Sequence, residues 1–149
     1  MYAPQDLGWT DSHTTDFEPP AVEGFLPARV AAQQRGAYIL FTELGELRAE
    51  ASGRLEHEAR VGGMPAVGDW VAIAARPDEG TGTIHAVLPR RTKFSRKVAG
   101  NASEEQVLAA NVDAVFLLMS LNEDFNLRRL ERYITMAWES GAQPVIVLT

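Results

Sequence analysis

The spacing of apolar and polar residues divides the chain into two parts of different character. Between residues 24 and 89, short apolar or alternating runs separated by turn-forming residues predict strands at 25–30, 37–41, 47–51, 67–73 and 83–88. Residues 53–64 interrupt the series as an irregular or briefly helical stretch. Five short strands fit a small closed barrel. The OB-fold is the natural candidate and an SH3-like barrel is the main alternative, because periodicity does not separate the two.

The strand expected at 67–73 shows the alternation most clearly. Trp70 and Ala72 fall on one face of this strand, whereas Val71 and Ile73 fall on the other. We therefore predict that Trp70 is a core residue. Residues 77–80 predict the turn that follows, because proline presets φ and glycine accepts a positive φ.

Longer apolar runs after residue 103 predict an α/β unit. Residues 103–106 have the form of a capping box and predict a short helix that continues to Ala110. The runs at 112–119 and 145–148 are typical of strands buried on both faces. Between them, a helix capped by Asp124 or Asn126 and ended by Gly141 is expected to make the strands parallel. The apolar stripe of this helix consists of Leu127, Leu130, Ile134, Ala137 and Trp138.

The first 23 residues differ from the rest of the chain. They carry five acidic side chains and no lysine or arginine, and two prolines at 19–20 close the stretch. This composition predicts a poorly ordered or loosely docked leader. Leu7, Trp9 and Phe17 are the residues that could attach parts of it to the barrel.

Composition limits the function classes that the chain can serve. The absence of cysteine excludes disulfides and thiolate metal sites within these residues, and the three histidines show no ligand spacing. No membrane-spanning run and no signal-peptide pattern is found, so we expect a cytoplasmic protein. The net charge of −6 argues against nucleic-acid binding by the whole surface. No nucleophile–base pair or paired-acid pattern occurs, so no catalytic residue is expected in this chain.

Residues 90–97 stand out against this acidic background, because they carry five basic side chains and no acidic one. Cations neutralise phosphates, and an exposed aromatic ring can stack on an unpaired base. The segment therefore predicts an RNA-binding site made of Arg90, Arg91, Lys93, Phe94, Arg96 and Lys97. A solvated linker between two domains is the alternative, and for Phe94 alone the alternative is burial between the domains. For Arg128, Arg129 and Arg132, solvation and pairing with Glu131 or Asp124 are the expected roles.

Several strings, in their order and spacing, resemble one family. They are VGDWV at 67–71, RRTKFSRK at 90–97, EQVLAANVD at 105–113, DFNLRRLERY at 124–133 and GAQPVIVLT at 141–149. Together they resemble the circularly permuted, ribosome-small-subunit-dependent GTPases of the RsgA/YjeQ type over roughly residues 25–149. The resemblance implies an OB-fold barrel followed by a GTPase domain with its motifs in permuted order. The expected division is a leader at 1–23, a barrel at 24–89, a basic linker at 90–102 and the start of the GTPase domain at 103–149.

The resemblance also implies the partners of the whole protein. These are the 30S ribosomal subunit and its 16S rRNA during late maturation, GTP with Mg²⁺, and a structural zinc ion in a later part of the family's chain. Thr149 would begin the guanine-specificity motif Asn/Thr-Lys-x-Asp. No G-x-x-x-x-G-K-S/T pattern occurs in the chain, so the chain alone is not expected to hydrolyse GTP.

Two parallel strands with one helix do not complete an α/β domain. We therefore expect a continuing polypeptide, or self-association of this chain through the uncovered strands. A stand-alone OB-fold module that binds RNA or a protein, without GTPase activity, is the alternative function.

Overall fold

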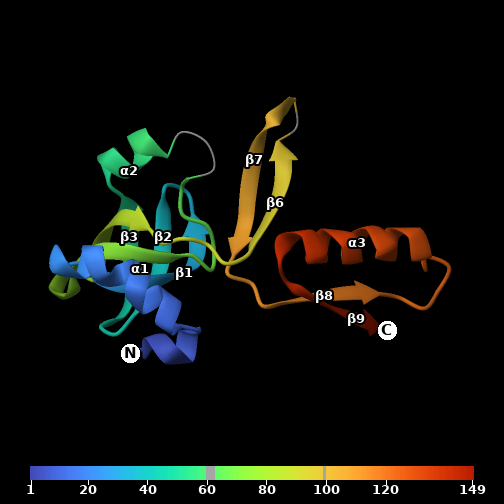
Figure 1. Ribbon diagram of the computed structural model, residues 1–149, viewed down its shortest axis with the longest axis horizontal. Coiled ribbons are helices and arrows are strands. Elements are labelled where there is room, and N and C mark those ends of the chain that lie inside the picture. The colour runs from blue at the N-terminus through green and yellow to red at the C-terminus, as the bar shows by residue number, and fades with distance from the viewer. Residues whose placement is uncertain (60–62, 99) are drawn as a thin grey trace.

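The computed structural model describes residues 1–59, 63–98 and 100–149 (Figure 1). Three parts follow one another along the chain: a five-stranded barrel with an N-terminal helical segment against its wall, a two-stranded hairpin, and a strand–helix–strand unit. The hairpin stands between the other two parts (Figure 1). No helix in these ranges has the length and apolar character needed to cross a bilayer.

The barrel has the topology expected of an OB-fold. Its strands are β1 (Leu26–Gln34), β2 (Ala37–Thr42), β3 (Gly45–Ala51), β4 (Trp70–Arg76) and β5 (Thr81–Val87), closed in the order β1-β2-β3-β5-β4. β4 pairs back onto β1, and β3–β5 is the parallel pair. Helix α2 (Gly53–Glu58) joins β3 to β4, and the 3-10 turn η2 (Pro77–Glu79) joins β4 to β5. Residues 60–62 of the predicted irregular stretch lie outside the described residues.

The alternation along β4 correctly predicts which of its side chains share a face. Val71 and Ile73 point into the barrel core with Leu40 and Ile84. Trp70 and Ala72 point outward but are buried under the N-terminal segment, and Trp70 is 2% exposed. The prediction that Trp70 is a core residue is confirmed, although the core that it joins lies outside the barrel.

The prediction of a loosely docked leader is wrong. Residues 1–23 form the 3-10 turn η1 (Pro4–Leu7) and helix α1 (Asp11–Val22). Phe17 and Trp9 pack with Trp70, and the Trp9 and Trp70 rings meet edge-to-face with centroids 4.7 Å apart. A few aromatic side chains thus provide enough buried apolar area to hold a polar segment in place.

His13 is the buried titratable group of this segment. Its Nδ1 accepts the Thr10 N–H at 3.0 Å, and its Nε2 has no hydrogen-bond partner among the described residues. Burial lowers the pKa of His13, the positive charges of Arg91 and Arg29 lower it further, and Asp16 opposes them. The folded state therefore binds fewer protons than the unfolded state when the pH falls below about 6.5, the ordinary histidine pKa.

We accordingly expect the stabilising effect of neutral His13 to be complete above about pH 6.5 and to be lost as the pH falls towards its lowered pKa. A His13→Gln variant keeps an acceptor for the Thr10 N–H but has no proton to bind. Urea unfolding between pH 7.5 and 5.5 should show a larger loss of stability for the wild type than for the variant. His57 and His85 are common to both proteins, so their contribution cancels. A larger loss in the variant would contradict this assignment.

The hairpin consists of β6 (Lys93–Val98) and β7 (Asn101–Ala110), paired antiparallel. The predicted helix from 103 to 110 is therefore wrong, and the predicted linker at 90–102 contains β6 and the beginning of β7. Glu105 illustrates the reason, because its carboxylate contacts Lys93 and Ser95 on the partner strand. Pairing with a neighbouring strand overrides the local helix signal. The division into these four ranges itself remains a prediction.

The strand–helix–strand unit follows the prediction. β8 (Ala114–Met119) and β9 (Gln143–Leu148) are parallel, and α3 (Leu127–Ser140) connects them. Asn126 caps α3 by accepting the Arg129 N–H, and Gly141 ends it with φ of 86°. Leu130, Ile134 and Ala137 form the packed stripe of α3, whereas Leu127 and Trp138 at its edges are exposed.

Only one face of this small sheet is covered within the described chain. Leu117 and Met119 pack under α3, but Phe116 and Leu118 are 66% and 67% exposed on the opposite face. The prediction that β8 is buried on both faces is therefore not met here. Self-association through the exposed face stays a prediction.

Candidate nucleic-acid interface

The basic segment, residues 90–97, leaves the barrel and becomes β6. Its first member, Arg90, faces the barrel. The Nε and Nη2 of Arg90 donate to the two carboxylate oxygens of Asp69 at 2.8 and 2.7 Å, and Nη2 also donates to the Met64 carbonyl. Asp69 is fully buried and accepts the Ala66 N–H at 2.8 Å as well. The hydrogen bonds to Asp69 raise the pKa of Arg90, and its guanidinium belongs to the fold rather than to an open surface.

Arg91 and Lys93 form more exposed contacts. The Arg91 guanidinium lies 3.5 Å from the Asp113 carboxylate, and Lys93 Nζ lies 2.7 Å from Glu105. Ser95 also donates to Glu105, and the hydrogen bonds from Lys93 and Ser95 lower the pKa of that carboxyl. Exposed ion pairs contribute little stability, so a phosphate can compete for these cations.

Arg96 and Lys97 are the most available cations of the basic segment. Both are exposed. Arg96 donates to the Gln106 side chain at 3.0 Å. Within the described part of the chain, no carboxylate forms an ion pair with either of them.

Phe94 lies half-buried in a groove of about 470 Å³ between β6 and α3. One wall of the groove is residues 93–97 with Glu105, and the other is Met136, Glu139 and Ser140 of α3. A bulge in the pairing follows Phe94, because Phe94 pairs with Ala109 but Ser95 pairs with Val107. The groove thus brings the ring of Phe94 together with Lys93, Arg96 and Lys97, whereas Arg90 and Arg91 do not line it.

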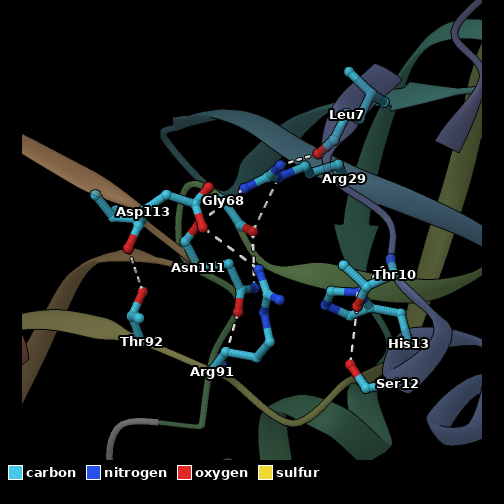
Figure 2. Close-up of polar contacts among 11 residues, drawn as sticks. Leu7, Thr10, Ser12, His13, Arg29, Gly68, Arg91, Thr92, Asn111 and Asp113 are labelled. Atoms are coloured by element: carbon cyan, nitrogen blue, oxygen red, sulfur yellow. Dashed lines mark hydrogen bonds and ion pairs between the residues drawn. The ribbon is translucent and has the colours of Figure 1, made fainter. Parts of the chain in front are cut away.

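A second polar cluster joins the barrel, the hairpin and β8, and Figure 2 shows it. Arg29 donates to the carbonyls of Leu7, Gly68 and Asn111, one from each of three segments. The Asn111 side chain donates to Gly68 O at 3.0 Å and accepts the Arg91 N–H at 2.9 Å. Burial lowers the pKa of Arg29, with Asp113 opposing this shift. Because these donors are used within the chain, the cluster serves as a structural joint.

The sequence alone does not indicate this joint. Gly68 falls within an expected barrel strand, and Asn111 falls within one of the strings that resemble the family. The local sequence signal is the residue type, because glycine and asparagine tolerate a positive φ. In the structure, φ is 90° at Gly68 and 53° at Asn111. The residues that the Asn111 side chain contacts lie 20 and 43 positions away in the chain, so no local pattern indicates them.

Thr149 lies at the carboxyl ends of the parallel strands. Its N–H donates to Met119 O at 3.0 Å, and its carbonyl accepts the Leu121 N–H at 2.8 Å. Ligands of open α/β sheets bind at this edge. Among the described residues, no group of histidine and carboxylate side chains is arranged to hold a metal ion.

The sequence of the chain is similar to those of known proteins. A family model described as RsgA GTPase matches residues 87–149, which include the basic segment and both strands of the α/β unit. A small ribosomal subunit biogenesis GTPase RsgA from Opitutus terrae is 53% identical over 95% of this chain and 41% of its own length. Its counterpart from Streptomyces coelicolor is 42% identical over 95% of this chain and 38% of its own length.

The chain belongs to the RsgA family. Two solved structures show a similar fold. YloQ, described as a circularly permuted GTPase, superposes with a TM-score of 0.61 at 19% identity over 83% of this chain and 40% of YloQ. YjeQ from Thermotoga maritima superposes with a TM-score of 0.63 at 20% identity, over 83% of this chain and 41% of its own.

The chain spans about two fifths of the length of the RsgA relatives from O. terrae and S. coelicolor. The expected fold class, an OB-fold barrel followed by part of a circularly permuted GTPase domain, is confirmed by the barrel topology and these structures. The roles of the basic segment and of Thr149 remain predictions.

Proposed function

We propose that this chain is the ribosome-docking part of a small-subunit biogenesis GTPase and that β6 binds RNA of the 30S subunit. The observation that carries the proposal is the groove in which Arg96, Lys97 and Phe94 lie together. The names of the relatives, small ribosomal subunit biogenesis GTPases, support the identity of the partner. Binding would take place in the cytoplasm during late maturation of the subunit.

The physical basis is phosphate neutralisation combined with base stacking. Arg96 and Lys97 have no carboxylate partner in the described chain, so no ion pair with a carboxylate of the described residues has to be broken when a phosphate binds. Phe94 offers a ring on which an unpaired base of 16S rRNA can stack. The net charge of −6 on the whole chain disfavours other orientations, so one basic face directs the approach.

The residues of this chain do not fit GTP hydrolysis by themselves. Phosphate binding in these enzymes uses a G-x-x-x-x-G-K-S/T loop and a hydroxyl on Mg²⁺, and the sequence has no such pattern. We propose that hydrolysis belongs to the whole protein, is stimulated by the subunit and is absent from the 149-residue chain, with Thr149 taking part in guanine recognition.

The test is binding of the 149-residue chain to purified 30S and 50S subunits over a salt series. We expect selective binding to 30S. An Arg96→Glu/Lys97→Glu variant should bind at least about tenfold more weakly, with a salt slope reduced by about 0.7–0.9 per lost phosphate contact. Arg90 is left unchanged, because its ion pair with Asp69 holds the fold together.

The matched control is Arg54→Glu/Arg76→Glu, which makes the same change of net charge at exposed arginines of the barrel. Equal loss of binding in both variants would show a general charge effect and refute a site on β6. Absence of 30S binding by the wild-type chain would refute docking by this chain.

A further inference from the structure

The outer face of α3 carries a second group of cations. Arg128 and Arg132 are four residues apart, so their side chains lie on one side of the helix, roughly 6 Å apart along its axis. Both are exposed. They line a shallow depression together with Glu131, Thr135 and Met136.

This depression adjoins the groove on β6, because Met136 lines both of them. The cations of α3 and those of β6 therefore lie on the two sides of one shared residue. Figure 1 shows the C-terminal end of α3 lying beside the base of the hairpin, with β6 as the nearer strand. Residues more than 30 positions apart in the chain therefore form one face.

The charges of this face are suited to a polyanion. Its cations are Lys93, Arg96, Lys97, Arg128 and Arg132, and its carboxylates are Glu105, Glu131 and Glu139. Glu105 is already paired with Lys93. Within the described ranges, Arg128 and Arg132 have no ion-pair partner, whereas Arg54 and Arg76 on the barrel each contact a glutamate. Arg129 differs from its neighbours, since it donates to the Asp124 carbonyl.

We propose that the RNA-binding surface extends from β6 onto α3, and that Arg128 and Arg132 bind phosphates of the same RNA. This extension rests on the proposed function of β6. It assigns to these arginines a direct role in place of the solvation that the sequence alone favours. Met136, 41% exposed between the two groups of cations, provides an apolar floor.

The test compares Arg128→Gln/Arg132→Gln with the wild type in the same 30S binding assay over a salt series. Loss of two phosphate contacts should lower the salt slope by about 1.4–1.8 and weaken binding at low salt. Arg54→Gln/Arg76→Gln removes the same charge from the barrel and should bind like the wild type. Glu131→Gln removes a negative charge beside both arginines and should tighten binding, a gain that a misfolded protein would not show.

Two outcomes separate failure of this extension from failure of the proposed function. If the β6 variant loses 30S binding but Arg128→Gln/Arg132→Gln keeps the wild-type affinity and slope, the extension is wrong and β6 docking stands. If neither variant changes binding, or the wild type does not bind, the proposed function is wrong as well.

The chemical nature of the partner is tested by cross-linking. A photoreactive amino acid placed at Thr135, an exposed position in the same depression, should form a cross-link to 30S subunits that ribonuclease removes. A cross-link that survives ribonuclease would show contact with a ribosomal protein and overturn the RNA assignment.

Discussion

Replacing Asp69 with alanine will lower the free energy of unfolding by about 3–5 kcal/mol. Asp69 is fully buried and accepts hydrogen bonds from Arg90 at 2.8 and 2.7 Å and from the Ala66 N–H at 2.8 Å. The variant leaves the largely buried Arg90 guanidinium without its carboxylate, and a buried charge without its partner is strongly unfavourable. Urea unfolding followed by circular dichroism measures the loss.

The control for this prediction is an exposed ion pair of the same barrel. Glu58→Ala removes the partner of Arg54, whose side chain is 85% exposed, and should cost far less than Asp69→Ala, because exposed ion pairs contribute little stability. A double-mutant cycle between Asp69 and Arg90 should show a large coupling energy. If Asp69→Ala lowers the free energy of unfolding no more than Glu58→Ala does, the ion pair between Asp69 and Arg90 does not stabilise the fold. Arg90 would then return to the candidate RNA-binding residues.

Replacing Gly68 with alanine will lower stability by more than about 2 kcal/mol and loosen the hairpin from the barrel. Gly68 has φ of 90°, and an added Cβ would overlap the backbone carbonyl of Ala110. The Ala110 N–H donates to Val67 O at 2.8 Å, which is a direct backbone bond between hairpin and barrel. Backbone cannot move aside as a flexible side chain can, so this bond must lengthen or break.

Gly36→Ala is the matched control for Gly68. Gly36 also has a positive φ, 69°, but a Cβ there would meet no atom within 4 Å. Its cost should be only the backbone strain of about 1–2 kcal/mol. Hydrogen exchange should show faster exchange of the Ala110 amide in Gly68→Ala and an unchanged rate in Gly36→Ala. Equal costs and an unchanged Ala110 rate would contradict close packing at the joint.

Local patterns determined most of the elements of this protein. Alternation in β4 correctly separates Val71 and Ile73 from Trp70, because successive side chains of a strand point to opposite faces. The Asn126 cap and the Gly141 end of α3 are also confirmed, as are Leu130, Ile134 and Ala137 of its stripe, whereas Leu127 and Trp138 are exposed. These features depend on interactions within a few residues, so they can be predicted from the sequence before any partner segment is known.

Only the tertiary structure decided how these elements are used. The segment predicted as a helix up to Ala110 is β7, since β6 provides a strand partner that the sequence does not reveal. Arg90 forms an ion pair with Asp69, which lies 21 positions earlier in the chain. The face of β4 that points away from the barrel core is buried by the N-terminal segment. The candidate interface itself combines β6 with α3. Each of these outcomes depends on contacts between distant segments, which are selected by packing and charge pairing in the folded chain and leave no periodic signal in the sequence.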